Sequence, residues 1–151
     1  MMAPMGSNVE LHRIVRDRLF GREQRYTTGR RQIVDALAAA AGPVTLPELL
    51  AGQPSLAQST AYRNLSIMEG AGIVRRLVHD TEHAHYELAE DLTEHHHHLI
   101  CENCGLIRDI TLTPHLERSL DTAFAGVARA EGFAPRHHAI DIYGHCAACA
   151  A

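Results

Sequence analysis

The sequence predicts an α+β protein in which helices and a β-hairpin form an N-terminal domain and an α/β domain follows it. Apolar residues recur at helical spacing through most of the first 70 residues, and two strand-like runs follow at 73–78 and 83–88. The last third of the chain combines strand-like segments with one long helix and carries two C-x-x-C pairs. These observations predict two small domains joined by a short connection.

The N-terminal helices are separated by glycine and proline. Apolar residues at helical intervals predict helices over 11–19 and from residue 28 to the Gly42-Pro43 pair. In "VTLPE", Thr45 and Glu48 have the spacing of a capping box, which predicts the start of a short third helix. The order helix, helix, helix is therefore expected before the hairpin.

A fourth amphipathic helix over about 59–69 precedes the hairpin at 73–88, whose turn is "HDTE". Helices followed by a hairpin are the order of a winged helix-turn-helix domain, in which the second helix of the turn enters the DNA major groove. The polar face of 59–69 includes Tyr62, which can contact a thymine methyl group, and Arg63, which can reach guanine or phosphate. The alternative is a solvated helix face with a half-exposed tyrosine.

Charge is unevenly distributed in this 151-residue chain, whose formal net charge is −4. Residues 10–31 hold seven arginines against three acidic residues, which favours a polyanionic partner, although a solvated arginine-rich face is the common alternative. The longest apolar run is 37–41 and the N-terminus lacks the pattern of a signal peptide, so we expect a cytoplasmic protein with no membrane partner.

All four cysteines fall in the C-terminal third, at Cys101, Cys104, Cys146 and Cys149. Two C-x-x-C pairs in a reducing compartment favour a tetrahedral structural Zn²⁺ site, with no open position for a catalytic water. The alternative is a redox C-x-x-C of thioredoxin type, which a second pair and twelve histidines in the chain disfavour.

Four consecutive histidines, residues 95–98, run directly into the first cysteine pair. On a strand, alternate side chains point to opposite faces, so His95 and His97 share one side while His96 and His98 share the other. The run therefore predicts two half-sites for a divalent metal such as Zn, Fe, Mn, Co or Ni. The hairpin strand offers His83, His85 and Glu87 on one face, unless that face is simply solvated.

The remaining segments complete the domain assignment. The acidic stretch "ELAEDLTE" is expected to be a hinge without turns of its own. A long helix is expected from Pro114, with Thr113 as N-cap and Gly132 as its end, and "HAIDIYG" is expected to form the last strand, beginning at His138. The predicted boundaries are 1–88 for the winged-helix domain, 89–94 for the hinge and 95–151 for the metal-binding domain.

Three segments in this order, "STAYRNLSIMEGAGIV", "HHHHLICENCG" and "HHAIDIYGHCAAC", resemble the ferric-uptake-regulator family of metal-responsive repressors, over about residues 22–149. In character the chain is most similar to the zinc-uptake branch. The resemblance implies a homodimer that binds double-stranded operator DNA through winged-helix domains, has a C-terminal α/β dimerisation domain with a four-cysteine zinc site, and represses uptake genes when metal is bound.

The resemblance also implies roles for individual residues. A structural zinc site is implied at the four cysteines, and a second site in the dimerisation domain at His95, His97, Glu117 and His138. A regulatory site at the hinge is implied for His96, His98 and Glu87. DNA contacts are implied for Arg25 in the minor groove and for Tyr62 and Arg63 in the major groove. Ser59 and Thr60, at the N-terminal end of the same helix, are also expected to contact DNA.

The chain departs from the family pattern at the hinge site. Iron and peroxide sensors supply a histidine just before the second helix, where this chain has "GPVT". Zinc sensors of actinobacterial type supply a cysteine shortly after the hairpin strand, where this chain has Ala89 or a neighbouring acidic residue of "LAEDLT". The fourth regulatory ligand is therefore open between His85, His83, Glu90 and Asp91. Zn²⁺ is favoured over Fe²⁺ or Ni²⁺, and iron-, nickel- or peroxide-responsive repressors remain alternatives.

Other classes of protein fit the sequence less well. A zinc hydrolase or deaminase requires H-E-x-x-H, or H-x-E followed by P-C-x-x-C, and neither motif occurs. A metal-storage module explains the ligands but leaves the winged helix without a role. The sequence therefore predicts a protein that is not an enzyme.

Overall fold

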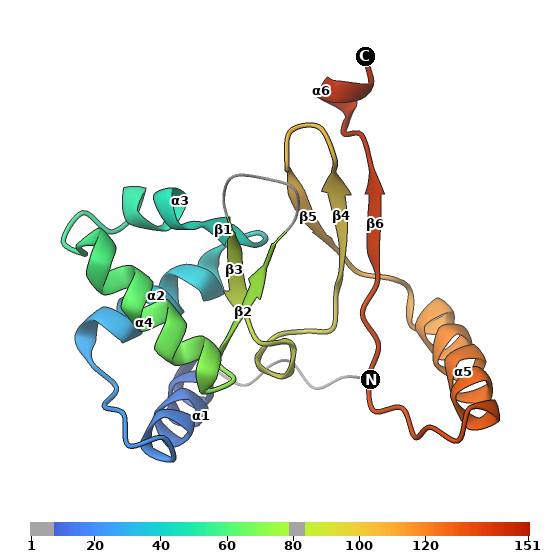
Figure 1. Ribbon diagram of the computed structural model, residues 1–151, viewed down its shortest axis with the longest axis horizontal. Helices are drawn as coiled ribbons and strands as arrows, with labels where there is room; N and C mark the ends of the chain where they lie inside the picture. Colours follow the sequence, from blue (N-terminus) through green and yellow to red (C-terminus); the bar gives the residue numbers. More distant parts are fainter. Residues whose placement is uncertain (1–7, 79–83) are drawn as a thin grey trace. The chain divides into compact units, whose positions relative to one another are not determined.

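The computed structural model describes residues 8–78 and 84–151, which fall into two compact units that divide between His95 and His96 (Figure 1). Each unit has its own three-stranded sheet. Among the described residues, no helix has the length and apolarity needed to cross a membrane. The domain boundaries that the sequence suggests, at 88 and 94, stay a prediction.

Helices dominate the first unit: α1 (Asn8–Phe20), α2 (Thr28–Ala39), α3 (Leu46–Ala51) and α4 (Gln58–Gly70). The capping box is confirmed, since the Thr45 hydroxyl accepts from the Glu48 amide at 3.3 Å and the Glu48 carboxylate accepts from the Thr45 amide at 2.8 Å. Helix α2 begins after the N-cap Thr27 and ends at Ala39, three residues earlier than the Gly42-Pro43 stop suggests.

The hairpin strands are β2 (Val74–Leu77) and β3 (His85–Leu88), and they pair antiparallel. A third strand, β1 (Val44–Thr45), adds to β3, giving the order β1-β3-β2. This strand was not predicted, because two residues are too few to carry an alternating pattern. The predicted "HDTE" turn and His83 lie outside the described residues.

The core of the first unit is apolar and extends into the predicted hinge. Residues from every helix of this unit pack with the sheet, and Leu92, only 2% exposed, belongs to the same cluster. The prediction that this acidic segment has no turn was wrong, because Glu90–Leu92 forms the 3-10 helix η1. Arg18 of α1 ties η1 in place by pairing with Asp91 and donating to the Gly72 carbonyl at 2.6 Å.

The second unit is an α/β arrangement with strand order β5-β4-β6. Strand β4 pairs antiparallel with β5 and parallel with β6. The last strand starts at Asp141, so the prediction that His138 begins it was wrong, and the short C-terminal helix was not predicted. The elements are β4 (His97–Cys101), β5 (Ile107–Ile110), α5 (Pro114–Ala130), β6 (Asp141–Gly144) and α6 (Ala147–Ala150).

Helix α5 has the ends that the sequence predicts. The Thr113 hydroxyl accepts from the Leu116 amide at 3.3 Å, Pro114 occupies the first turn, and Gly132 follows the helix with φ of 68°, a conformation that glycine tolerates best. No residue of α5 is buried. Its apolar stripe consists of Leu116, Leu120, Phe124 and Val127, and Phe124 and Val127 are 38% and 67% exposed. In a single chain much of this stripe is therefore open to solvent.

Candidate metal centres and nucleic-acid interface

Helix α4 presents one face to the core and the other to solvent. Ala61, Leu65 and Met68 are fully buried, which leaves Ser59, Tyr62 and Arg63 on the outside and Thr60 half-buried. Tyr62 is 56% exposed, so its ring is available for contact with another molecule. This face can lie against another molecule without any rearrangement of the fold.

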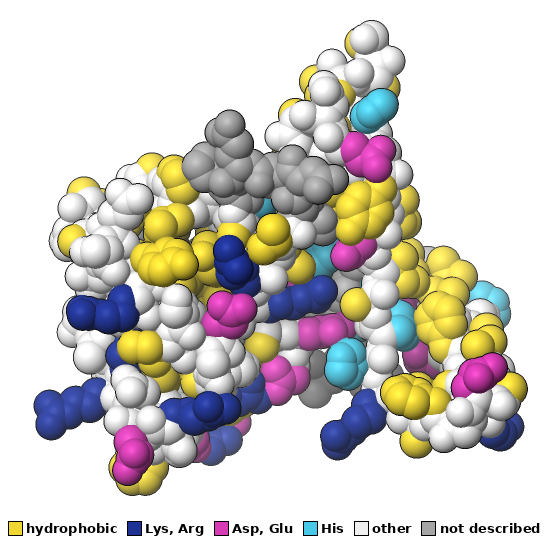
Figure 2. Space-filling view, in the orientation of Figure 1, with side chains coloured by type: hydrophobic (Ala, Val, Ile, Leu, Met, Phe, Trp, Pro, Cys, Tyr) yellow, Lys and Arg dark blue, Asp and Glu magenta, His cyan; other side chains and the backbone are white. Residues whose placement is uncertain are grey.

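Arginines accompany α4 on the first unit, where Figure 2 shows their side chains in dark blue projecting from the surface. Arg25 is exposed in the loop before α2. The buried Arg30 joins this loop to α4, because its guanidinium donates to the Arg25 carbonyl at 2.5 Å and to the Asn64 side chain at 3.1 Å. Burial, followed by the charge of Arg63, lowers the pKa of Arg30.

Sequence reasoning missed Arg30, although its position offered a signal. Residues 30, 33, 34 and 37 share one helical face, and the other three are apolar core residues, so an arginine at the start of that face must bring its own partners inside. A third bond, from Arg30 to the Gln24 side chain at 3.0 Å, adds to the two that hold the guanidinium. Arg30 thus fixes the spacing between the Arg25 loop and α4.

A second buried network holds the same loop from its other side. His12 of α1 bonds the Tyr26 hydroxyl at 2.5 Å through Nδ1 and the Asp35 carboxylate at 2.8 Å through Nε2. Burial raises the pKa of Tyr26 to about 12, so its hydroxyl stays protonated at neutral pH. Tyr26, the residue next to Arg25, is therefore anchored to α1 through His12, and His12 in turn is held by Asp35 of α2.

The four cysteines come together in the second unit, with their sulfur atoms all within 4.8 Å of one another. The turn after β4 brings Cys101 and Cys104 together, and Gly105 closes it with φ of 75°. The second pair arrives at the end of β6, where the Cys146 amide donates to the Cys101 sulfur at 3.3 Å. Four thiols at this spacing match the donor set of a closed tetrahedral metal site.

The thiol pKa values diverge across this cluster. The backbone amide of Cys104, followed by that of Cys146, lowers the pKa of Cys101 to about 6. The Leu106 amide acts in the same direction on Cys104, but bonds with neighbouring thiols outweigh it and raise the pKa of Cys104 to about 11. Four thiolates this close together would repel one another, and a bound cation would stabilise them, so the cluster fits a metal ion.

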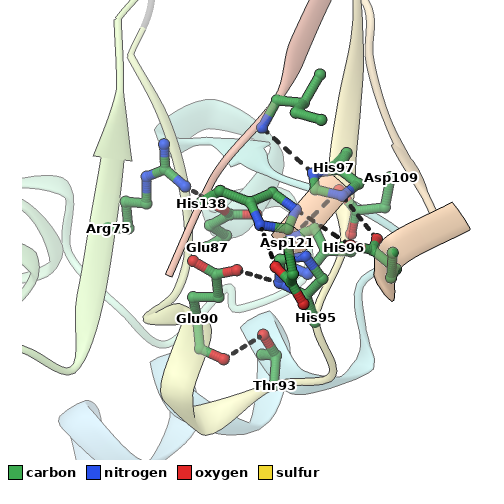
Figure 3. Close-up of polar contacts among 12 residues, drawn as sticks. Arg75, Glu87, Glu90, Thr93, His95, His96, His97, Asp109, Asp121 and His138 are labelled. Atoms are coloured by element: carbon green, nitrogen blue, oxygen red, sulfur yellow. Dashed lines mark hydrogen bonds and ion pairs between the residues drawn. The ribbon is translucent and has the colours of Figure 1, made fainter. Parts of the chain in front are cut away.

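Adjacent histidines of β4 point into different clusters. His97, 1% exposed, lies 2.8 Å from the Glu117 carboxylate of α5, and His138 lies 3.1 Å from the other oxygen of the same carboxylate. The Ile140 amide donates to His97 Nδ1, which leaves Nε2 directed at Glu117, and Asp121 holds His138 Nδ1 at 3.0 Å (Figure 3). Two imidazoles around one carboxylate are a fitting donor set for a divalent cation.

His98, on the other face of β4, and His96, the residue just before the strand, lie around Asp109 of β5. Their Nε2 atoms are 3.9 Å and 3.5 Å from an Asp109 oxygen, and Asp141 holds His98 Nδ1 at 3.0 Å. The predicted alternation is confirmed here, since His97 and His98 face different carboxylates. Asp109 was missed, because its approach depends on the register that pairs it with His98.

The remaining predicted ligands belong to the first unit. Glu87 and His85 of β3 are buried, and Arg75 of the neighbouring strand lies 3.8 Å from the Glu87 carboxylate. The two fallback ligands have other contacts: Asp91 pairs with Arg18, and Glu90 lies 2.5 Å from His95, the last residue of this unit.

A winged-helix unit with an exposed polar helix, joined to an α/β unit with clustered metal ligands, defines a metal-binding protein of the DNA-binding class. The model of the ferric uptake regulator family matches residues 22–143. The chain belongs to this family, whose members are transcriptional regulators rather than enzymes.

Three similar proteins place the chain within the family. The ferric uptake regulation protein of Bordetella parapertussis is 37% identical over 67% of this chain and 68% of its own length. The peroxide operon regulator of Bacillus subtilis is 32% identical over 64% of this chain, and the match spans 61% of that protein, less than two thirds. The ferric uptake regulator of Helicobacter pylori has the same fold, with a TM-score of 0.75, 19% identity, and coverage of 99% of this chain and 98% of that one. Other matching structures are described as zinc and manganese uptake regulators.

Proposed function

We propose that this chain is a metal-dependent transcriptional repressor that binds double-stranded operator DNA as a homodimer and controls metal-uptake genes, with zinc favoured as the metal. The observation that carries this proposal is that strand β4 directs His97 and His98 into two different clusters of imidazole and carboxylate groups. The other unit of the same chain exposes the polar face of helix α4 beside several arginines. A cytoplasmic location agrees with this role.

In the DNA complex, α4 enters the major groove. Tyr62 and Arg63 contact base edges, Ser59 and Thr60 near the helix N-terminus contact the backbone or bases, and Arg25 reaches the minor groove. The exposure of Tyr62 and the bond that holds the Arg25 carbonyl on Arg30 support this assignment, because the first leaves a contact surface and the second fixes the loop.

Three metal sites follow from the ligand clusters. A structural Zn²⁺ at the four cysteines stabilises the second unit. A second metal is held by His97, Glu117 and His138, with His95 as the fourth ligand. The regulatory metal is held by His96, His98 and Glu87. Asp109 fits the fourth position of that site better than His85, Glu90 or Asp91, because its carboxylate lies close to both histidines in the second unit.

Zn²⁺ is the favoured regulatory metal over Fe²⁺ and Ni²⁺, because the histidine that iron and peroxide sensors place before the second helix is absent from "GPVT". A metal held by Glu87, His96 and His98 would join a ligand of the DNA-binding domain to ligands of the dimerisation domain. A ligand shifts a conformational equilibrium only by its different affinity for the two states, so the bridging site is the one that gates DNA binding.

Dimerisation is supported by the apolar stripe of α5, which is exposed in the single chain. The proposed organisation keeps a winged-helix domain at 1–88, a hinge at 89–94 and a dimerisation and metal-binding domain at 95–151. Packing this stripe against the same stripe of a second copy removes apolar surface of both chains from water.

The test is a titration of DNA binding with metal. An operator is first selected from random duplex DNA with the zinc-loaded protein, and its affinity is then measured against free Zn²⁺, Fe²⁺ and Ni²⁺. His96→Ala and His98→Ala are expected to remain dimeric and keep zinc at the cysteines but lose metal-dependent binding, while Glu117→Ala loses only part of it. A His96→Ala protein that responds to metal as the native protein does contradicts the proposed regulatory site.

A further inference from the structure

One buried carboxylate of the β2–β3 hairpin, that of Glu87, lies opposite an arginine on the neighbouring strand. Glu87 on β3 has a side chain only 9% exposed, and the Arg75 guanidinium on β2 lies 3.8 Å from it. The two residues are directly opposite each other in the β2–β3 register, so the pairing is a consequence of the sheet itself. In Figure 3 the Arg75 side chain extends from its strand towards Glu87.

The partner strand also supplies a matched comparison. Arg76 is the next residue on β2, but its register partner is Tyr86, and alternation directs its side chain to the opposite face from Arg75. Arg76 is exposed, whereas the Arg75 side chain is 37% exposed and lies against Glu87. The two arginines therefore share a strand and a charge but differ in their access to Glu87.

A buried carboxylate is costly unless a positive charge compensates it. Arg75 supplies that charge in the structure, and a divalent cation that takes Glu87 as a ligand supplies it instead. A guanidinium and a divalent cation repel each other, so both cannot lie against one carboxylate with full effect.

We propose that Arg75 and the regulatory metal compete for the Glu87 carboxylate, so that metal binding releases Arg75 to DNA phosphates that lie along the β2–β3 hairpin. This inference rests on the proposed function and gives its regulation a second component. The metal then acts on DNA affinity through a freed positive charge on β2, in addition to any change in domain orientation. Arg75 is a coupling residue, which senses the metal through Glu87 without binding it.

The first measurement is metal affinity in the absence of DNA. Arg75→Gln removes the competitor, so the regulatory metal should bind roughly tenfold more tightly, as judged by zinc competition with a chromophoric chelator in protein whose cysteine site is already filled. Arg75→Lys keeps a positive charge opposite Glu87 and should return the affinity most of the way to the native value. Arg76→Gln should leave it unchanged.

The second measurement is DNA affinity against salt concentration, with and without zinc. Arg75→Gln should lower the salt slope by about one unit in the zinc-loaded protein only, because the native Arg75 is held by Glu87 when metal is absent. Arg76→Gln should have equal effects in both states. Native metal affinity in Arg75→Gln, or an equal loss of DNA affinity in both states, overturns the inference.

The native chain separates this inference from the function on which it rests. If zinc leaves the DNA affinity of the native protein unchanged, the proposed function fails and the inference fails with it. If the native protein responds to zinc and Arg75→Gln responds identically, only the competition for Glu87 is wrong.

Discussion

Replacing Arg30 with methionine should destabilise the first unit strongly, although Arg30 is not itself one of the proposed DNA contacts. The side chain is 7% exposed and its guanidinium bonds Asn64, the Arg25 carbonyl and Gln24. Gln24 is half-buried, so its side chain can bond to water once Arg30 is lost. Only the bonds to Asn64 and to the Arg25 carbonyl are therefore counted in full. At about 1.5–3 kcal/mol for each bond from a charged donor, the expected loss is roughly 3–6 kcal/mol.

Arg31→Met is the matched control, because Arg31 is the next residue of α2 but is exposed and stacks over the Tyr26 ring at 5.7 Å. Its loss should cost no more than about 1 kcal/mol. Urea unfolding is followed by far-UV circular dichroism with zinc present, and amide hydrogen exchange in α2 and α4 assigns the change to the first unit. Equal midpoints for Arg30→Met and Arg31→Met would refute the argument that the buried guanidinium holds the loop and α4 together.

Three other contacts lead to further tests. Cys101→Ser should lose the structural metal and unfold the second unit, since metal binding of this kind contributes on the order of 10 kcal/mol to folding; metal content and thermal melting measure this, and unchanged values for both would exclude it. Arg63→Ala should cost roughly 1–3 kcal/mol on the specific site, whereas Arg25→Ala should also reduce the salt slope, and both should remain dimeric by sedimentation. Asp91→Asn tests the pair with Arg18, whose hydrogen bond lowers the pKa of Asp91. A carboxyl group with a lowered pKa stabilises the folded state at pH above its ordinary pKa, and this stabilisation is lost as the pH falls through the lowered pKa. The native protein should therefore be more stable than Asp91→Asn by at most about 1 kcal/mol at neutral pH, with no difference in strong acid. A difference that persists in strong acid would mean that the pair is not its cause.

Local sequence rules account well for the helices. The capping residues Thr45 and Thr113 and the stop at Gly132 act within a few residues of themselves, so their effects can be read from the chain alone. The alternation of the histidine run also depends only on strand geometry. What these rules could not supply was a two-residue strand, β1, which exists because β3 offers it a pairing edge.

The position of Asp109 beside the histidines could have been predicted from the sequence with one further step of reasoning. The tight "CENCG" turn pairs Ile100 with Ile107, and two steps back along the antiparallel ladder place Asp109 opposite His98. Working out that register from the turn would have identified the carboxylate. Arg30 required different information, since whether a buried arginine is satisfied depends on Asn64, 34 residues away along the chain.

Because α5 buries none of its residues in the single chain, its 17 residues have little tertiary support without a partner. Folding of the second unit is then linked by mass action to subunit association, and its melting temperature should rise with protein concentration. A newly made chain would reach its metal-competent form only once a partner is available. The cellular amount of this regulator would therefore help to set the metal concentration to which it responds.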